Sequence, residues 1–194
     1  MALILAGGRS SRFGSDKALA RFRGEPLVAR AVRLSLERFA RVAVVAKTPA
    51  LYAALVPGAV ALVPDADAHA SPLSGLAAGL AWGGDAWAFA VDMPFAAESP
   101  LAEALLAALL AALGDAPAAA ATLDGVVQPL AAVYRGSCAT LAARLAAAGA
   151  GPRALLDAVG ARLVDVTGGP LVRALLDADT PEALAALEHL KGSP

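Results

Sequence analysis

The chain has 194 residues, 58% of them hydrophobic, with a net charge of −1 at pH 7 and a mean hydropathy of +0.63. This length fits one α/β domain, and the apolar content supports a sizeable core, which excludes a disordered chain. The longest strongly apolar helical stretch, 104–114, is shorter than the roughly 20 residues of a membrane span. No basic leader precedes an apolar segment, and the single cysteine, Cys138, excludes an internal disulfide. We therefore expect a soluble cytoplasmic protein without a membrane partner.

Charge is distributed unevenly along the chain. Residues 1–47 carry ten basic side chains and three acidic ones, whereas residues 48–134 contain no lysine or arginine. Four of the charged residues follow helical spacing, which predicts a solvated helix face: Arg30, Arg33, Glu37 and Arg41. The earlier cluster of Arg9, Arg12 and Lys17 has no such spacing and indicates an anionic ligand. Few aromatic residues accompany these basic side chains, so a nucleic-acid partner is not expected.

Short apolar runs alternate with longer helical patterns, which is typical of βαβ units and a mostly parallel sheet. The first half is predicted to contain, in chain order, a strand at 3–5, a helix at 26–39, strands at 42–45 and 59–63, a helix at 72–80, a strand at 87–91 and a helix at 98–113. The second half is predicted to contain strands at 118–123 and 129–134 around the turn Asp124-Gly125, helices at 137–148 and 152–159, a strand at 162–166 and a helix at 181–190. No internal repeat or linker divides these elements, so we expect a single three-layer α/β domain over residues 1–194.

The segment after the first predicted strand has the composition of a phosphate-binding loop. It reads Leu5-Ala6-Gly7-Gly8-Arg9-Ser10-Ser11-Arg12-Phe13-Gly14-Ser15-Asp16-Lys17. Glycines let a backbone approach a ligand closely, successive amide N–H groups bind phosphate oxygens, and Arg12 and Lys17 add positive charge. The spacing fits neither the Walker A loop nor the G-x-G-x-x-G loop of dinucleotide-binding enzymes. A flexible surface turn is the alternative interpretation.

An acidic residue follows the predicted strand at 87–91. Asp92 is expected just beyond the carboxyl end of that strand, where open α/β sheets bind ligands. Mg²⁺ prefers one or two carboxylates together with phosphate oxygens, and Pro94 stiffens the loop, so Asp92 is the best candidate metal ligand. The alternative is a structural aspartate that accepts hydrogen bonds from loop amides.

The loop resembles the signature of the nucleotidyltransferases, and its Gly-Gly pair followed by Asp16-Lys17-Ala18 most resembles the molybdenum cofactor guanylyltransferases of the MobA family. Phe13 stands where that family usually has methionine. Other segments are similar to further motifs of the family: Val63-Pro64-Asp65, Ser71-Pro72-Leu73-Ser74-Gly75-Leu76, Val91-Asp92-Met93-Pro94-Phe95, Gln128-Pro129-Leu130 and Asp179-Thr180-Pro181-Glu182-Ala183-Leu184. The resemblance implies a Rossmann-like nucleotidyltransferase fold with three α/β/α layers.

The same resemblance implies transfer of GMP from GTP to Mo-molybdopterin, with GTP bound by the N-terminal half and the pterin by the C-terminal half. It implies Mg²⁺ as the cofactor, with Mn²⁺ as the alternative and Asp92 as the ligand. The implied nucleotide-binding residues are Leu5, Ala6, Gly7, Gly8, Lys17, Asp65 and Asp92, and the implied catalytic residues are Arg12, Lys17 and Asp92. Molybdoenzyme apoproteins or other proteins of the cofactor pathway are candidate partners.

Some residues near the expected ligand edge of the sheet keep two interpretations. Asp65 follows a strand; it accepts hydrogen bonds from guanine if the resemblance holds, or it caps a loop. Lys47 stands near a position where the family usually has asparagine, and it is a candidate contact for the nucleotide base. Asp177 and Asp179 contribute to a metal site, or Asp179 accompanies Thr180 at a helix N-terminus.

Rival functions on the same scaffold are CTP-dependent cytidylyl transfer to the same pterin and nucleotidyl transfer to a sugar phosphate. Gly8 and Asp16-Lys17-Ala18 favour guanylyl transfer, whereas Asp177-Ala178-Asp179 is closer to the cytidylyltransferase pattern. A non-catalytic nucleotide-binding or cofactor-delivery module is a rival of another class. The presence of both Lys17 and Asp92 argues against it, because a pure binding protein needs no metal ligand.

Overall fold

A seven-stranded sheet forms the centre of the computed structural model, which describes residues 1–7, 13–65 and 71–190. The strands follow the order β5-β4-β1-β6-β8-β7-β9. Their bounds are β1 (Ala2–Leu5), β4 (Val42–Ala46), β5 (Ala61–Pro64), β6 (Ala86–Ala90), β7 (Ala118–Leu123), β8 (Val126–Tyr134) and β9 (Arg162–Asp165). Strand β8 runs antiparallel to β6 and β7, and the other neighbours in the sheet are parallel. The predicted mostly parallel sheet is therefore confirmed.

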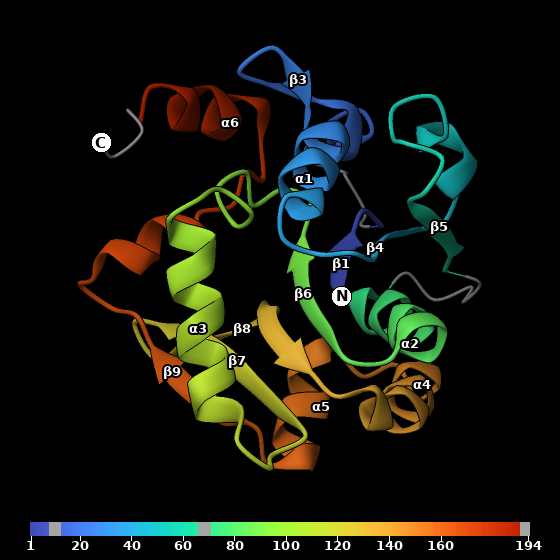
Figure 1. Ribbon diagram of the computed structural model, residues 1–194, viewed down its shortest axis with the longest axis vertical. Coiled ribbons are helices and arrows are strands. Elements are labelled where there is room, and N and C mark those ends of the chain that lie inside the picture. Colours follow the sequence, from blue (N-terminus) through green and yellow to red (C-terminus); the bar gives the residue numbers. More distant parts are fainter. Residues whose placement is uncertain (8–12, 66–70, 191–194) are drawn as a thin grey trace.

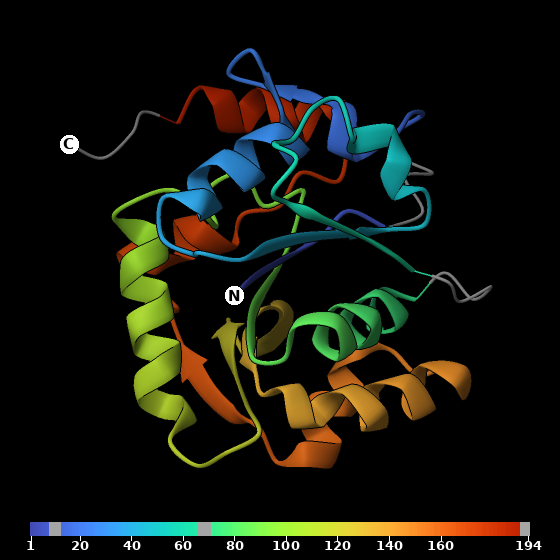
Figure 2. The same cartoon turned by 45° about the vertical axis from the view of Figure 1, so that its right-hand side comes forward.

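Helices cover both faces of this sheet (Figures 1 and 2). Their bounds are α1 (Leu27–Leu36), α2 (Pro72–Gly83), α3 (Leu101–Leu113), α4 (Ala139–Ala147), α5 (Pro152–Val159) and α6 (Pro181–Glu188). The sheet has one hydrophobic core on each face. Because side chains alternate between the faces along a strand, Ala2 and Ile4 of β1 lie in one core and Leu3 and Leu5 lie in the other. The first core packs against α1, α3 and α6 and the second against α2, α4 and α5, which is the predicted three-layer α/β/α arrangement. In the described parts of the chain, no helix is long and apolar enough to cross a membrane.

Every predicted helix and strand is present, with ends that differ from the expected ones by three residues or fewer. Prolines account for several of these differences. Pro26 and Pro100 are the N-cap residues of α1 and α3, so these helices begin at Leu27 and Leu101 rather than earlier. Pro64 is the last residue of β5 instead of following it. An edge strand tolerates proline because one of its sides needs no N–H donor.

The chain between β1 and α1 contains short elements that the sequence analysis did not predict. A single 3₁₀ turn, η1 (Lys17–Leu19), precedes a hairpin of β2 (Arg21–Phe22) and β3 (Glu25–Pro26). Strands of two residues are too short to show an alternating pattern. The other 3₁₀ helices in the described residues are η2 (Pro49–Tyr52), η3 (Gly136–Cys138) and η4 (Pro170–Leu175).

Arg30 is buried, which contradicts the predicted solvated face. The residue is 9% exposed. Its guanidinium donates to Glu98 Oε2 at 2.6 Å and to the carbonyl oxygen of Pro94 at 3.4 Å. Helical spacing identified a common face, but it could not show that a carboxylate 68 residues away covers part of that face. Arg30 thereby holds the loop that begins at Asp92 against α1.

Gly79 on α2 packs directly against β1. A Cβ atom at this position would lie 2.4 Å from Leu3 Cδ1 and 2.9 Å from Leu3 Cγ, and Leu3 is fully buried. We therefore predict that Gly79→Ala lowers the free energy of unfolding by about 1–3 kcal/mol, even though alanine favours the helix by about 1 kcal/mol.

Gly75, one turn earlier on the same helix, provides the matched control. A Cβ there would lie 3.5 Å from its nearest neighbours, in ordinary van der Waals contact. Gly75→Ala should therefore keep or raise the stability. Urea denaturation of both variants measures the difference, and equal midpoints would contradict the predicted clash.

Candidate active site

The carboxyl ends of β1 and β6 lie side by side at the point where the chain switches from adding strands on one side of β1 to adding them on the other. After β1 the chain adds β4 and β5 on one side and then returns to add β6 on the other. Strands β1 and β6 are neighbours (Figure 1). In their register Leu5 pairs with Ala90. Open α/β sheets bind ligands at such a switch point. The loop after β1 and the loop that begins at Asp92 therefore leave the sheet at the same place.

Lys17 connects three segments of the chain at this point. Its Nζ lies 2.7 Å from Asp92 Oδ2 and 3.0 Å from Asp179 Oδ1. The ring centroid of Phe13 lies 5.9 Å from the same nitrogen. The Lys17 side chain is 13% exposed, that of Asp92 20% and that of Asp179 53%, so the cluster opens to solvent on the Asp179 side.

The cluster combines a stable positive charge with an excess of carboxylates. Burial lowers the pKa of the Lys17 ammonium, but the hydrogen bonds and charges of Asp92 and Asp179 raise it by more, and the net shift is upward. Burial raises the pKa of Asp177, and the negative charges of Asp92 and Asp179 raise it further. Lys17 acts on the Asp177 pKa in the opposite direction without cancelling this shift. Such an arrangement can hold an added cation and bind an anion beside it.

A backbone contact fixes the segment before α6 against the Asp92 loop. The N–H of the buried Ala178 donates to the carbonyl oxygen of Asp92 at 3.0 Å. Thr180 is the N-cap residue of α6, because its hydroxyl accepts from the Ala183 N–H at 3.1 Å. Asp179 accompanies Thr180 at this helix N-terminus, as one of its two interpretations predicted, and its carboxylate contacts Lys17.

The other predicted nucleotide-binding residues of the first loop lie where β1 ends. Leu5 and Ala6 are buried, and the Ala6 N–H donates to the carbonyl oxygen of Val45 on β4 at 2.8 Å. Gly7 follows at the same edge, and a Cβ there would lie 3.6 Å from the β4 backbone. Lys47 follows β4 and is exposed. Two predicted residues, Gly8 and Arg12, lie outside the described residues.

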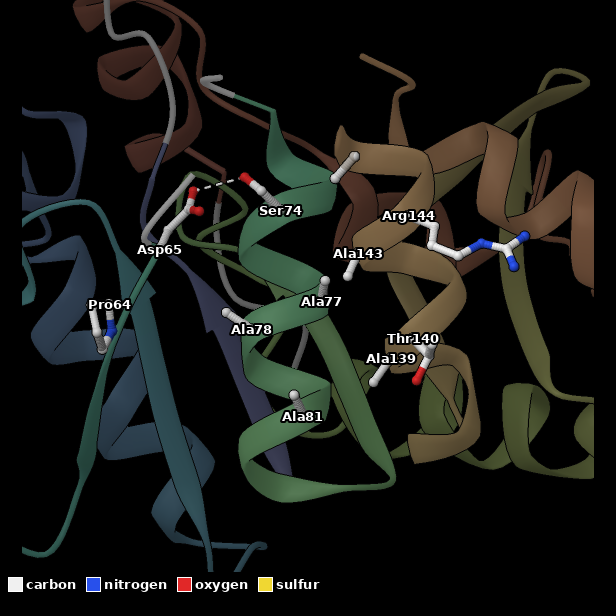
Figure 3. Close-up of a pocket in the computed structure, with 11 residues that line it drawn as sticks. Pro64, Asp65, Ser74, Ala77, Ala78, Ala81, Ala139, Thr140, Ala143 and Arg144 are labelled. Carbon is white, nitrogen blue, oxygen red and sulfur yellow. Dashed lines mark hydrogen bonds between the residues drawn. The ribbon is translucent and has the colours of Figure 1, made fainter. Parts of the chain in front are cut away.

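Asp65 lies two strands away from β1, directly after β5, and is 8% exposed. Its carboxylate is 3.0 Å from the hydroxyl of Ser74 on α2, and the N-cap of that helix is Ser71 rather than Asp65. Figure 3 shows this contact at one end of a pocket of about 550 Å³ between α2 and α4. The walls are mostly alanine, and Arg144 directs its guanidinium away from α2. The Asp65 end therefore suits an uncharged hydrogen-bond donor such as a base, whereas phosphate is better matched by Lys17.

The ion pair of Lys17 with Asp92 was not predicted from the sequence, although both residues were candidate site residues. Two further contacts of Lys17 were not predicted either. Asp179 was singled out, but its contact with Lys17 joins residues 162 positions apart, and no spacing rule links them. Phe13 was noted as a departure from the family pattern, without the ring contact that it makes. The one sequence signal for both was their place within motifs of the family.

A family model described as the MobA-like NTP transferase domain matches residues 2–166. The chain belongs to this family. The match extends from β1 to the residue after β9 and includes Lys17, Asp65 and Asp92. Asp177 and Asp179 lie beyond it, in the segment that returns to the switch point before α6.

Proteins similar to this chain match it over nearly its full length. A probable molybdenum cofactor guanylyltransferase of Chloroflexus aggregans is 35% identical over 98% of this chain and 94% of its own length. The solved molybdopterin-guanine dinucleotide biosynthesis protein A of Archaeoglobus fulgidus matches with a TM-score of 0.77 and 20% identity over 97% of both chains. A protein of Mycobacterium tuberculosis H37Rv, solved as a complex with manganese, matches with a TM-score of 0.65 and 17% identity over 98% of both chains. The family recognised from the sequence motifs is confirmed, and the two solved structures support the Rossmann-like fold.

The acidic cluster gives a prediction about stability. In the folded state the pKa of Asp177 is raised, so the native protein holds this proton more tightly than the unfolded chain does, and ionisation of Asp177 destabilises the fold. The destabilisation sets in as the pH rises above about 4, where an unperturbed aspartate ionises. Asp177→Asn should therefore raise the melting temperature at pH 7, and this gain should vanish below about pH 4.

Thermal melts from pH 3.5 to 8 in EDTA measure this pH dependence. Asp115→Asn is the control, because Asp115 is an exposed aspartate that follows α3 at the opposite edge of the sheet. It should give no comparable gain. A stability difference for Asp177→Asn that does not depend on pH would contradict the electrostatic explanation.

Proposed function

We propose that this chain is a nucleotidyltransferase that transfers GMP from GTP to the terminal phosphate of Mo-molybdopterin and releases pyrophosphate. The observation that carries the proposal is the Lys17 cluster at the switch point between β1 and β6, with Asp92 at 2.7 Å. It gives a phosphate-binding charge and a candidate metal ligand on the two loops that the family motifs identify. The curated relative from Chloroflexus aggregans, which carries the name of a probable guanylyltransferase, supports the choice of reaction.

The reaction joins an oxygen of the pterin phosphate to the α-phosphorus of GTP and breaks the bond from that phosphorus to the bridging oxygen of pyrophosphate. The acceptor phosphate is already anionic, so the protein needs no strong general base. Positioning and charge stabilisation then account for most of the rate enhancement. In this proposal Lys17 and Arg12 stabilise negative charge on the α-phosphate and on the departing pyrophosphate.

A divalent cation, which we propose to be Mg²⁺ with Mn²⁺ as the alternative, fits the oxygen donors of this site. Asp92 would hold it, and the Asp179 carboxylate contacts the same Lys17 ammonium. Among the described residues, no group of three or more His, Cys, Asp or Glu side chains is arranged to hold a metal by itself. The nucleotide phosphates and water would supply the remaining ligands, as is usual for Mg²⁺. When bound, the cation neutralises charge on the phosphates.

The remaining assignments extend the same proposal. The backbone of residues 5–8 would bind the nucleotide, and Asp65 would accept hydrogen bonds from the N1–H and amino group of guanine. The N-terminal half of a single domain over residues 1–194 would hold GTP, and the C-terminal half would hold the pterin. We propose a cytoplasmic location, where molybdoenzyme apoproteins or other proteins of the cofactor pathway would be partners.

Nucleotide choice tests the guanylyl assignment directly. Isothermal titration of the protein with Mg²⁺ and GTP, CTP, ATP or UTP should show preferred binding of GTP. Lys17→Ala should weaken that binding roughly tenfold to a hundredfold, because it removes a charge-assisted phosphate contact. Preference for CTP would instead move the assignment to cytidylyl transfer, which the carboxylate pair Asp177 and Asp179 also allows. No binding to any of the four nucleotides would contradict the proposal as a whole.

Turnover tests the roles of the site residues. Asp92→Ala should lower the rate of pyrophosphate release with GTP and Mo-molybdopterin by about 10²–10³. Asp157→Ala changes an exposed aspartate on α5 and should leave the rate unchanged. An Asp92→Ala protein with nearly normal turnover would rule out the metal-binding role, and nucleotide binding without turnover in the unmodified protein would favour a non-catalytic module.

A further inference from the structure

Tyr52 is a buried tyrosine whose hydroxyl contacts both ends of the loop after β1. It is the last residue of η2, between β4 and β5, and is 2% exposed. The hydroxyl donates to Asp16 Oδ2 at 2.8 Å and lies 3.5 Å from the carbonyl oxygen of Ala6. A hydroxyl has one hydrogen to donate, and the carboxylate is both the closer and the stronger acceptor. Ala6 begins the loop, and Asp16 ends it.

The Tyr52 hydroxyl remains a donor over the working pH range. Burial raises its pKa, and the hydrogen bond and charge of Asp16 raise it further. The Tyr52 hydroxyl therefore keeps the hydrogen that it donates to Asp16. Tyr52 is buried and Asp16 is half-buried, so loss of this bond would leave a carboxylate oxygen without its protein partner.

Asp16 in turn determines where Lys17 begins η1. Its second carboxylate oxygen, Oδ1, accepts from the Ala18 N–H at 3.0 Å, and its carbonyl oxygen accepts from the Leu19 N–H at 3.1 Å. A single 3₁₀ turn has little intrinsic stability, so its position depends on this cap. Lys17 is the first residue of that turn. Asp16 therefore links the Tyr52 hydroxyl on one side to the backbone that carries Lys17 on the other.

We propose that Tyr52 is a positioning residue for nucleotidyl transfer, which fixes Lys17 at the switch point by holding Asp16 beside the start of the same loop. The inference rests on the proposed function, because it assumes that Lys17 binds the nucleotide phosphates. Tyr52 itself acts through Asp16 and Lys17. The Lys17 Nζ lies 2.7 Å from Asp92 Oδ2. A shift of this nitrogen by much less than that distance would weaken every phosphate contact that the ammonium makes.

Tyr52→Phe removes the hydroxyl and keeps the buried ring. We expect the Kd for Mg·GTP to rise roughly tenfold, in line with the loss of one hydrogen bond to a charged group. Tyr134→Phe is the matched control: Tyr134 is equally buried, and its hydroxyl donates to the Pro129 carbonyl oxygen at 2.8 Å, within β8. Isothermal titration separates two explanations. A positioning role changes Kd at unchanged stoichiometry, whereas a merely structural role lowers the fraction of binding-competent protein and leaves Kd unchanged.

Asp16→Ser tests whether Tyr52 acts through Asp16. Serine caps a helix nearly as well as aspartate, but its side chain is too short to keep both contacts. The variant leaves the core unchanged, so it also serves if Tyr52→Phe fails to fold. We expect it to raise Kd by a similar factor, and the double variant Asp16→Ser/Tyr52→Phe should bind no more weakly than the weaker single variant.

The outcomes distinguish this inference from the proposed function. A tenfold rise in Kd for Tyr52→Phe, no rise for Tyr134→Phe and no added effect in the double variant would support it. An unchanged Kd for Tyr52→Phe, or effects that multiply in the double variant, would overturn the positioning role while GTP binding by the unmodified protein still stands. If the unmodified protein binds no nucleotide, the proposed function fails first and the inference falls with it.

Discussion

The contact of Lys17 with Asp92 and Asp179 is the interaction on which the arrangement of the site depends. It joins the loop after β1, which carries Lys17, to the loop after β6 and the segment before α6. Asp92 is 75 positions and Asp179 is 162 positions from Lys17 in the chain. The Lys17 side chain is 13% exposed, and its ammonium needs such partners because an unpaired charge in a mostly buried position would be costly. The three segments are thus held where a phosphate ligand can meet them.

Each participant in this contact is supported by a second set of interactions. Arg30 binds Glu98 and the Pro94 carbonyl oxygen and so steadies the loop that carries Asp92. The Ala178 N–H binds the Asp92 carbonyl oxygen and aligns the acidic segment before α6. Asp16 caps the turn that carries Lys17. Rigid support of this kind is what a site needs when its chemistry relies on placement of charge rather than on a covalent intermediate.

The charge balance of the cluster fits a ligand that brings both a cation and phosphates. Two carboxylates bind the ammonium, and Asp177 adds a third acidic group whose pKa is raised by burial and by its neighbours. A cation would offset this excess, and phosphate oxygens would complete its ligand shell. The apolar pocket beside Asp65 offers a different environment, since its alanine walls suit an uncharged planar group. Charge is therefore concentrated around Lys17, whereas apolar contact is available in the pocket between α2 and α4.

The amino-acid sequence by itself determined the fold class, the positions of the strands of the main sheet and of the α-helices to within three residues, and the loops that carry Lys17, Asp65 and Asp92. These features depend on local periodicity, proline and glycine positions and contiguous motifs, all of which are readable along the chain. Only the tertiary structure decided that Arg30 is buried and that Asp179 binds Lys17. Such contacts join residues from distant elements, and their pairing depends on strand order and packing, which no local pattern encodes.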